Sequence, residues 1–324
     1  MTMKAAVLGV GNMGRHHARI YFELPNIELV AISDTNEKIG RETAAKYKCN
    51  YYNNYLEMLE KESLDLVSIA VPTRLHKEVT LNCLKHVKNI LLEKPIADNL
   101  EDAKEIVGMA EVNKAKLMIG HLERFNPVVL KLKEIIESNE LGDIITVVSR
   151  RVGLPTPQIK NASVIIDLAI HDLDIFNFIF KKKPIKIFPL IGNKISSTKE
   201  DHADILLKFD NFNAFLQVNW LTPVKIRTLS ITGSKGYAEI NYITQELKIY
   251  KNNTAIEYDS FGDFVIKFGN PLELDIHIAK DEPLKNEIRS FVDSIEKNKE
   301  VPILLQDTLE ALELALKIQG LNGN

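Results

Sequence analysis

An aspartate and a histidine four positions apart, Asp167 and His171, have the types and spacing that general base catalysis uses. The segment 164–180 around them carries apolar residues at helical spacing, so both side chains are expected on one helix face, within hydrogen-bonding reach. A carboxylate that orients an imidazole prepares the ring to take a proton. A histidine satisfied within the core is the alternative for a generic helix, and helix packing explains Asp174 equally well.

Lys94 is a second candidate for chemistry, in the sequence Glu93-Lys94-Pro95 directly after the apolar run 90–92. A proline fixes the geometry of such a loop and permits a cis peptide bond. A lysine at the end of a buried strand can hold a substrate hydroxyl and make its proton easier to remove. From spacing alone, a solvated lysine before a turn is the alternative.

A glycine-rich loop near the N-terminus follows a short apolar run and precedes a helix-like segment. Strand, glycine turn and helix together present backbone N–H groups and a helix N-terminus to a phosphate. The first glycine permits a tight turn, the second lets the backbone approach a pyrophosphate, and the third lets the helix lie close to the strand. The loop predicted to bind the cofactor consists of Gly9, Val10, Gly11, Asn12, Met13 and Gly14.

Asp34 strengthens the prediction that the glycine loop binds a dinucleotide. It follows the apolar run 27–32 about twenty residues after Gly14, where a carboxylate can bind the adenosine ribose hydroxyls. The next residues, 35–37, bring no arginine for a 2′-phosphate, so NAD is favoured over NADP. The alternative is that Asp34 or Asn36 merely caps the next helix.

Two further strand ends are predicted to border the cofactor, because ligands of doubly wound sheets bind at the carboxyl ends of the strands. After the third apolar run, Pro72 would shape a loop over the cofactor and His76 would lie near the nicotinamide. A helix N-terminal histidine without chemistry is the equal alternative for His76. At the next strand end, Glu93 and Lys94 complete the predicted cofactor set.

Cationic side chains in the second half are candidates for substrate binding. Arg124 lies at the predicted crossover between domains, where a structural hinge role is an equal alternative. Arg151 and Lys160 belong to a basic, proline-rich stretch that could receive an anionic substrate, unless it is an ordinary solvated loop. The predicted substrate set is Arg124, Arg151, Lys160, Asp167 and His171.

The composition limits the classes of function. The chain has 324 residues, 45% of them hydrophobic, and 41 basic against 44 acidic side chains, so no basic excess points to nucleic acid. The two cysteines, Cys49 and Cys83, lack metal-like spacing, so we expect no metal site and a reducing, cytoplasmic location. No targeting segment and no membrane-spanning apolar run is recognised, so no membrane partner is expected.

The order of apolar segments predicts the fold class. Up to about residue 120, strand-like runs alternate with helix-like segments, which indicates a doubly wound parallel sheet. From 185 to 250, strands follow one another without helices, which indicates a mostly antiparallel sheet. The predicted domains are 1–121 and 122–324, with the option that the final helix, 306–319, packs back on the first domain.

These motifs together resemble the Gfo/Idh/MocA oxidoreductase family, over essentially the whole chain. The resemblance rests on the glycine loop, Asp34, Pro72-Thr73 with His76, Glu93-Lys94-Pro95-Ile96-Ala97, Asp167–Asp174, and Glu282-Pro283-Leu284 with Glu287. It implies an N-terminal Rossmann domain followed by a C-terminal α+β domain with a large, mostly antiparallel open sheet. It also implies catalytic roles for Lys94, Asp167 and His171, and a homodimer or homotetramer formed through that sheet.

The family resemblance further implies NAD-dependent oxidation of a sugar or cyclitol hydroxyl. Residues 123–127, Arg151-Val152-Gly153 and 167–174 look most like the branch containing UDP-N-acetylglucosamine 3-dehydrogenases, which implies oxidation at C3 of a UDP-N-acetyl-hexosamine. Arg151 and Lys160 would then meet the diphosphate, although Gly153-Leu154-Pro155 departs from the usual Gly-Pro after Arg-Val. A dehydrogenase of a free sugar or inositol and a noncatalytic NAD-binding sensor are the alternatives.

Overall fold

The computed structural model describes residues 2–155, 163–195, 199–251, 254–258, 264–268 and 271–321. The chain forms two compact units. The first comprises Met1–Leu122 and Glu282–Leu316, and the second comprises Glu123–Asp281 and Lys317–Asn324. The last helix, α9 (Leu305–Gly320), therefore contributes most of its length to the first unit.

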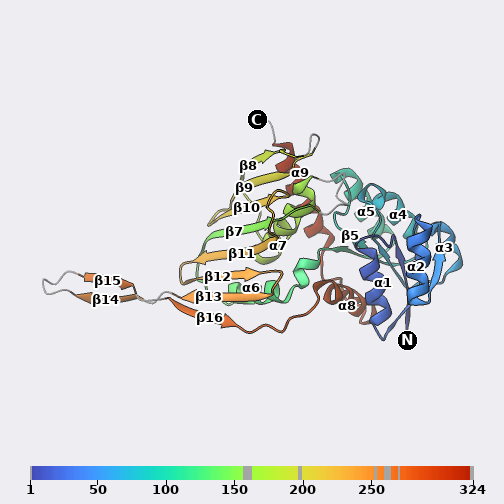
Figure 1. Cartoon of the computed structure of the whole chain (residues 1–324), viewed down its shortest axis with the longest axis horizontal. Helices are drawn as coiled ribbons and strands as arrows, with labels where there is room; N and C mark the ends of the chain where they lie inside the picture. The colour runs from blue at the N-terminus through green and yellow to red at the C-terminus, as the bar shows by residue number, and fades with distance from the viewer. Residues whose placement is uncertain are drawn as a thin grey trace. The chain divides into compact units, whose positions relative to one another are not determined.

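The first unit is built on a six-stranded parallel sheet with the strand order β3-β2-β1-β4-β5-β6 (Figure 1). Its inner strands are buried over almost their whole length, as expected for parallel strands covered on both faces. The doubly wound prediction is confirmed, but the short edge strand β3 was not predicted because its run is too brief and polar. The strands are β1 (Met3–Leu8), β2 (Ile27–Ser33), β3 (Asn50–Tyr52), β4 (Leu66–Ile69), β5 (Asn89–Glu93) and β6 (Lys116–Gly120).

The helices of the first unit begin where the sequence supplies caps. Asn36, Asn54 and Asn99 each accept a hydrogen bond from a backbone N–H in the first turn of α2, α3 and α5. The helices are α1 (Gly14–Glu23), α2 (Glu37–Tyr47), α3 (Tyr55–Lys61), the 3₁₀ turn η1 (Thr73–Leu75), α4 (His76–Cys83), α5 (Leu100–Val112) and α8 (Pro283–Glu296).

The second unit contains an eight-stranded sheet with the order β16-β13-β12-β11-β7-β10-β9-β8. One pair, β7 with β10, is parallel, and the other pairs are antiparallel, which confirms a mostly antiparallel open sheet. The prediction stopped at residue 250 and therefore missed β14, β15 and β16. The strands are β7 (Ile144–Val152), β8 (Lys186–Gly192), β9 (His202–Lys208), β10 (Asn213–Asn219), β11 (Ile226–Gly233), β12 (Gly236–Asn241), β13 (Glu246–Lys251), β14 (Thr254–Tyr258), β15 (Phe264–Phe268) and β16 (Leu272–Ile276).

Helical segments pack on one face of this sheet, and its side chains alternate accordingly between buried and exposed. Phe215, on β10, is exposed, whereas Trp220, directly after that strand, is buried. The predicted helix 164–180 does not begin as an α-helix: its first turn is a π-helix. The segments are η2 (Leu122–Phe125), α6 (Pro127–Glu137), the π segment η3 (Ile165–Ala169) and α7 (Ile170–Phe180).

Candidate functional site

The glycine loop connects β1 to α1 and leaves the start of that helix open to an anion. Met13 precedes the helix without a side-chain cap, and the first turn carries no acidic residue. The first N–H groups of a helix need a partner from outside it and favour a negative charge. The N-terminus of α1 is therefore a suitable place for a pyrophosphate.

Each glycine of the loop has the environment that its predicted role requires. Gly9 has a φ of +80°, and a Cβ there would lie 2.7 Å from the carbonyl oxygen of Ala70. A Cβ on Gly14 would lie 1.7 Å from the carbonyl oxygen of Gly9, so only glycine lets the helix approach the strand so closely. A Cβ on Gly11 would meet nothing within 4 Å, which leaves the approach to the backbone open. The loop thus fits a dinucleotide pyrophosphate.

Asp34 is held by two backbone N–H groups at the end of β2. Its Oδ2 accepts a hydrogen bond from the N–H of Val10 at 2.8 Å, and its Oδ1 accepts one from the N–H of Asn36 at 2.7 Å. The carboxylate is half-buried and lies directly against the glycine loop. Such a fixed acceptor beside a phosphate-binding turn suits ribose hydroxyls, as the sequence predicts.

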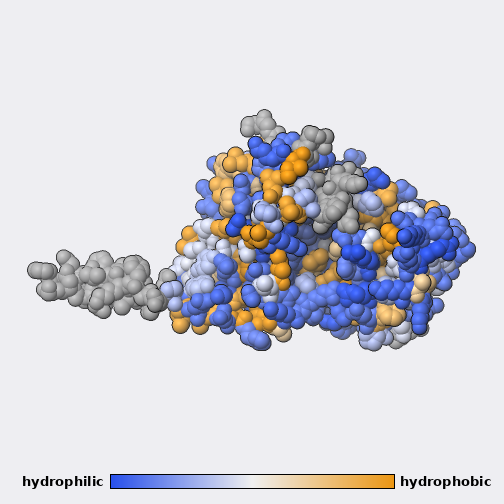
Figure 2. Space-filling view, viewed as in Figure 1, coloured by the Kyte–Doolittle hydropathy of each residue, from blue (hydrophilic) through white to orange (hydrophobic). Residues whose placement is uncertain are grey.

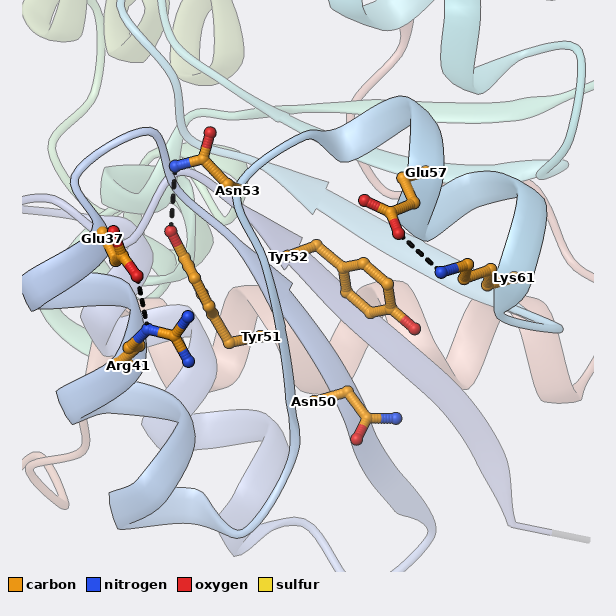
Figure 3. A pocket seen from close by; sticks show the side chains of 8 residues that line it. All are labelled: Glu37, Arg41, Asn50, Tyr51, Tyr52, Asn53, Glu57 and Lys61. Carbon is orange, nitrogen blue, oxygen red and sulfur yellow. Dashed lines mark hydrogen bonds and ion pairs between the residues drawn. The ribbon is translucent and has the colours of Figure 1, made fainter.

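A polar hollow lies beside Asp34, where β3 ends (Figure 3). The hydroxyl of Tyr51 donates to the carbonyl oxygen of Asp34 at 3.0 Å, and the N–H of Asp34 donates to the carbonyl oxygen of Tyr52 at 3.2 Å. Arg41 also lines the hollow, but its Nε donates to Glu37 at 2.7 Å and its guanidinium lies over the Tyr51 ring. Arg41 therefore lies in the neighbourhood of Asp34 although residues 35–37 contain no arginine, and its guanidinium is paired with the Glu37 carboxylate.

His76 has a different environment from the one predicted. Its ring is buried, and its two nitrogens lie 2.8 Å from the carbonyl oxygen of Pro95 and 2.9 Å from that of Val71, so that the neutral ring donates to one of the two. Burial lowers the pKa of His76, which these two carbonyl contacts only partly oppose. The histidine therefore joins the loop after β4 to the loop after β5. We place it as a support for Pro72 and Lys94 rather than as a cofactor contact.

The end of β5 presents Lys94 and buries Glu93. The Lys94–Pro95 peptide bond is cis, the form that the sequence left open. Lys94 is half-buried, whereas Glu93 is only 6% exposed and its Oε1 receives a hydrogen bond from His17 Nε2 at 2.9 Å. Glu93, predicted to contact the cofactor, instead turns into the unit, and sequence reasoning had not linked it to His17.

Asp167 and His171 lie at the start of the helical segment of the second unit. Asp167 is in the π turn η3 and His171 is the second residue of α7. Both are half-buried, while the three residues between them are buried, so the two accessible positions share a side. Single π turns occur frequently at functional sites. Lys94 belongs to the first unit, so its predicted meeting with His171 stays a prediction.

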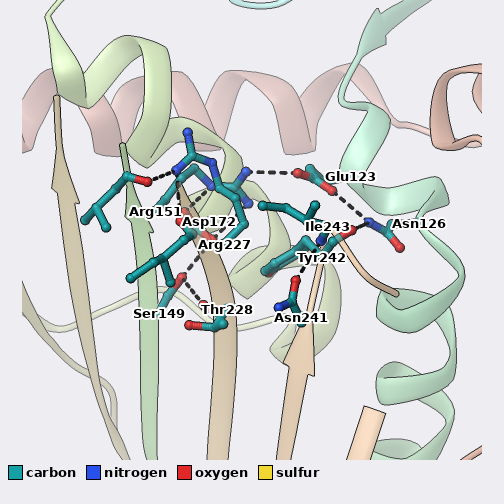
Figure 4. Close-up of polar contacts among 12 residues, drawn as sticks. Glu123, Asn126, Ser149, Arg151, Asp172, Arg227, Thr228, Asn241, Tyr242 and Ile243 are labelled. Atoms are coloured by element: carbon teal, nitrogen blue, oxygen red, sulfur yellow. Dashed lines mark hydrogen bonds and ion pairs between the residues drawn. The ribbon is translucent and has the colours of Figure 1, made fainter. Parts of the chain in front are cut away.

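Arg151 is committed to a buried network and does not face a substrate, which corrects the sequence-based assignment (Figure 4). Its Nε donates to Asp172 Oδ2 at 2.7 Å and its Nη1 to Glu123 Oε1 at 2.9 Å, while the guanidinium lies over the Tyr242 ring. Ser149 donates to the same Asp172 carboxylate at 2.8 Å. Burial alone would lower the pKa of Arg151, but Asp172 and Glu123 outweigh it and raise that pKa.

Arg124 is likewise internal. Its Nε and Nη2 donate to the two oxygens of Asp174 at 2.9 and 2.7 Å, and it lies over the Phe178 ring. Both side chains are buried, which agrees with the structural alternatives considered for Arg124 and Asp174, and substrate contact by Arg124 stays a prediction. Lys160 lies outside the described residues.

Arg227 is the cation that sequence reasoning missed. It pairs directly across the strands with Arg151, on β11 against β7, and its Nη1 donates to the carbonyl oxygens of Val152 and Ile226. The side chain is half-buried, and Asp167 is among the carboxylates that act on it. Burial and the neighbouring Arg151 lower the pKa of Arg227 to about 10. The sequence offers only an arginine near the start of a strand-like run, because its nearness to Arg151 comes from the pairing of β11 with β7.

Profiles of known families match both parts of the chain. "Oxidoreductase family, NAD-binding Rossmann fold" covers residues 3–121, and "GFO/IDH/MocA C-terminal domain" covers residues 129–239. The chain belongs to the Gfo/Idh/MocA oxidoreductase family. As a member of this family it is an NAD-binding oxidoreductase, and the glycine loop and Asp34 lie within the part of the chain that the NAD-binding model matches.

Named relatives of this Gfo/Idh/MocA protein are dehydrogenases. UDP-N-acetylglucosamine 3-dehydrogenase of Acidithiobacillus ferrooxidans is 26% identical over 300 residues, 92% of this chain and 90% of the relative. Its solved structure has a TM-score of 0.84 over 99% of this chain and 97% of that chain, at 25% identity. Inositol 2-dehydrogenase of Salmonella typhimurium is 27% identical over 82% of this chain and 85% of the relative.

The fold also matches a structure solved with the cofactor. Scyllo-inositol dehydrogenase of Lactobacillus casei, with bound NAD(H) and scyllo-inositol, has a TM-score of 0.81 at 18% identity and covers 99% of this chain and 96% of that chain. The NAD-binding family and the curated relatives identify the chain as an NAD(P)-dependent dehydrogenase. Among the residues that the structure describes, no helix is long and apolar enough to cross a membrane, and no group of three potential ligands could hold a metal ion.

Proposed function

We propose that this dehydrogenase oxidises a sugar hydroxyl, most specifically the C3 hydroxyl of a UDP-N-acetyl-hexosamine. Observations made separately in the two units support the proposal: in the first unit the glycine loop with Asp34 suits a dinucleotide and Lys94 follows a strand of the same sheet, and in the second unit Asp167 and His171 are half-buried and share a side. The relative from Acidithiobacillus ferrooxidans, similar over most of both chains, supports the nucleotide-sugar substrate.

The proposed roles follow from the chemistry of the side chains. Bound NAD supplies the hydride acceptor. His171 takes the proton of the substrate hydroxyl as the C–H bond gives up its hydride, and Asp167 holds the imidazole in the accepting tautomer and stabilises the imidazolium. Lys94 stabilises the negative charge that develops on the substrate oxygen. These roles need no metal ion.

Arg227 is the proposed contact for an anionic part of the substrate, in place of Arg151. Within the described part of the chain, its Nη1 hydrogen-bonds to backbone carbonyls only, so its other nitrogens can donate outward. Arg151, by contrast, is saturated by Asp172 and Glu123. A guanidinium suits a phosphate because it can donate two parallel hydrogen bonds. Asp167 is among the carboxylates whose charge acts on Arg227, which agrees with an anion site in the same part of the second unit.

We infer a second copy of this chain as a partner, bound through the exposed face of the large sheet. Neighbouring strands β8, β9 and β10 place Phe188, Leu206 and Phe215 in one row, and all three are exposed. Leu190, also on β8, is 74% exposed, and orange apolar surface is visible in this region in Figure 2. Contiguous exposed apolar side chains on a sheet face are typical of an interface.

The proposed function is tested by offering NAD with UDP-N-acetylglucosamine, free glucose and myo-inositol and following NADH. Formation of NADH with the nucleotide sugar supports the proposal, and formation with inositol or glucose alone supports the second enzymatic possibility. The inositol dehydrogenases among the relatives support a free sugar or inositol as the alternative substrate. Turnover of none of the three would favour a noncatalytic NAD-binding sensor.

A further inference from the structure

A continuous series of four buried, hydrogen-bonded polar side chains runs through the first unit to the end of β5, directly before Lys94. Tyr21 Oη lies 2.7 Å from Ser68 Oγ, and Ser68 Oγ lies 2.9 Å from His17 Nδ1. His17 Nε2 in turn lies 2.9 Å from Glu93 Oε1. Tyr21, His17 and Ser68 are fully buried, and Glu93 is 6% exposed.

A single direction of hydrogen bonding satisfies all four side chains of this series. The Tyr21 hydroxyl donates to Ser68, the Ser68 hydroxyl donates to Nδ1 of a neutral His17, and His17 donates from Nε2 to an ionised Glu93. Every donor is used once, and no second proton on the imidazole is needed. Buried polar groups are stable only when they are paired in this way.

This hydrogen-bonded series links α1, which begins at the glycine loop, to the end of β5, which precedes Lys94. His17 lies one turn into α1, the helix that begins at the glycine loop, and Ser68 lies on β4. Glu93 is the last residue of β5, directly before Lys94. A substitution at His17 can therefore act on Lys94 through Glu93.

We propose that His17 is a positioning residue for Lys94: by donating to Glu93 it keeps a buried carboxylate next to Lys94 and fixes the strand end from which the lysine reaches the substrate. The inference rests on the proposed function, in which Lys94 touches the reacting hydroxyl.

The charges around Glu93 agree with this role. Burial would raise the pKa of Glu93, but the hydrogen bond from His17 and the nearby positive charge of Lys94 bring it below its ordinary value. A Cβ on Gly120 would lie 3.4 Å from Glu93 Oε2, so the carboxylate is closely enclosed on that side as well. Without the donor from His17, burial would favour the protonated carboxyl.

The test compares His17→Met, which removes the donor, with His17→Gln, which can still donate to Glu93. His16→Met is the matched control, because His16 is the adjacent half-buried residue of the same helix and takes no part in this hydrogen-bonded series. Each protein, saturated with NAD, is examined by NMR of ¹³Cδ-labelled glutamate across neutral pH, and its kcat, KM and NAD affinity are measured with the sugar that wild type oxidises.

In His17→Met we expect Glu93 to titrate near neutral pH and kcat to fall between about 10-fold and 100-fold, with NAD affinity within about threefold of wild type. His17→Gln should keep Glu93 ionised and recover most of kcat, and His16→Met should match wild type. An ionised Glu93 in His17→Met, or a kcat within about twofold of wild type, would overturn the proposal. If wild type oxidises none of the sugars, the proposed function fails, and the Glu93 resonance alone decides whether His17 holds the carboxylate.

Discussion

The backbone N–H of Val10 donates to Oδ2 of Asp34 at 2.8 Å, so the glycine loop and the predicted ribose-binding acid form one hydrogen-bonded unit. Asp34→Ala removes both the loop support and the acceptor for the ribose hydroxyls. Because hydrogen bonds to a charged group contribute about 1.5–3 kcal/mol, we expect the Kd for NAD to rise about 10- to 100-fold, measured by calorimetry.

Asp65→Ala is the matched control for this measurement. Asp65 also accepts a backbone N–H of β1 at 2.8 Å, from Lys4, at the opposite end of that strand. Its loss should leave the Kd for NAD unchanged. Equal losses of affinity in the two variants would show that Asp34 acts only by stabilising the sheet.

Arg151 and Arg227 are paired across β7 and β11, but replacement by methionine should affect different properties of the protein. The change should lower stability at Arg151 and raise KM at Arg227. Arg151→Met leaves the buried carboxylate of Asp172 without its cation, so we expect a loss of about 3–5 kcal/mol in the free energy of unfolding. Arg227→Met should keep most of that stability but raise KM for UDP-N-acetylglucosamine. Denaturant unfolding and steady-state kinetics on both variants check this, and an unchanged KM in Arg227→Met would remove its proposed role.

Glu93 makes a pH-dependent contribution to stability. Its pKa in the folded chain lies below 4.5, because the hydrogen bond from His17 and nearby charges outweigh the effect of burial. The contribution is therefore fully present above the unfolded pKa and lost as the pH falls through the folded value. Wild type should be more stable than Glu93→Gln at about pH 7, and the difference should shrink toward about pH 3. A difference that grows in acid would contradict this sign.

Leu206→Lys should weaken self-association, because it places a charge within the apolar row of the large sheet. Sedimentation velocity on wild type should give a dimer or larger species, and the variant should shift toward monomer. Val112→Lys is the control, since Val112 is an exposed apolar residue of α5 in the first unit. A monomeric wild type would contradict the proposed partner.

The sequence predicted the parts of the fold that depend on local pattern. Continuous apolar runs located β1, β2, β4, β5 and β6, and the glycine spacing located the start of α1, because burial and backbone geometry act over a few neighbouring residues. The polar edge strand β3 has no comparable signal, whereas β15, with Phe264-Val265-Ile266, carries an apolar run that the prediction left unassigned.

The site was harder to predict, because burial depends on partners far along the chain. Arg151 and Arg227 are both arginines on strand-like runs, and only the pairing of Arg151 with Asp172 and Glu123 shows which one is internal. His17 is similar: its partner Glu93 is 76 positions away, a contact that no spacing rule reveals.

The most direct test of the account is NADH formation by wild type and His171→Ala, with NAD and UDP-N-acetylglucosamine. Wild type should form NADH with the nucleotide sugar, and His171→Ala should lose hydride transfer while its NAD affinity, measured separately, stays nearly unchanged. A wild type that forms no NADH with this sugar would contradict the proposed substrate. A His171→Ala variant that retains turnover, or that loses NAD binding, would contradict the assignment of His171 as the base.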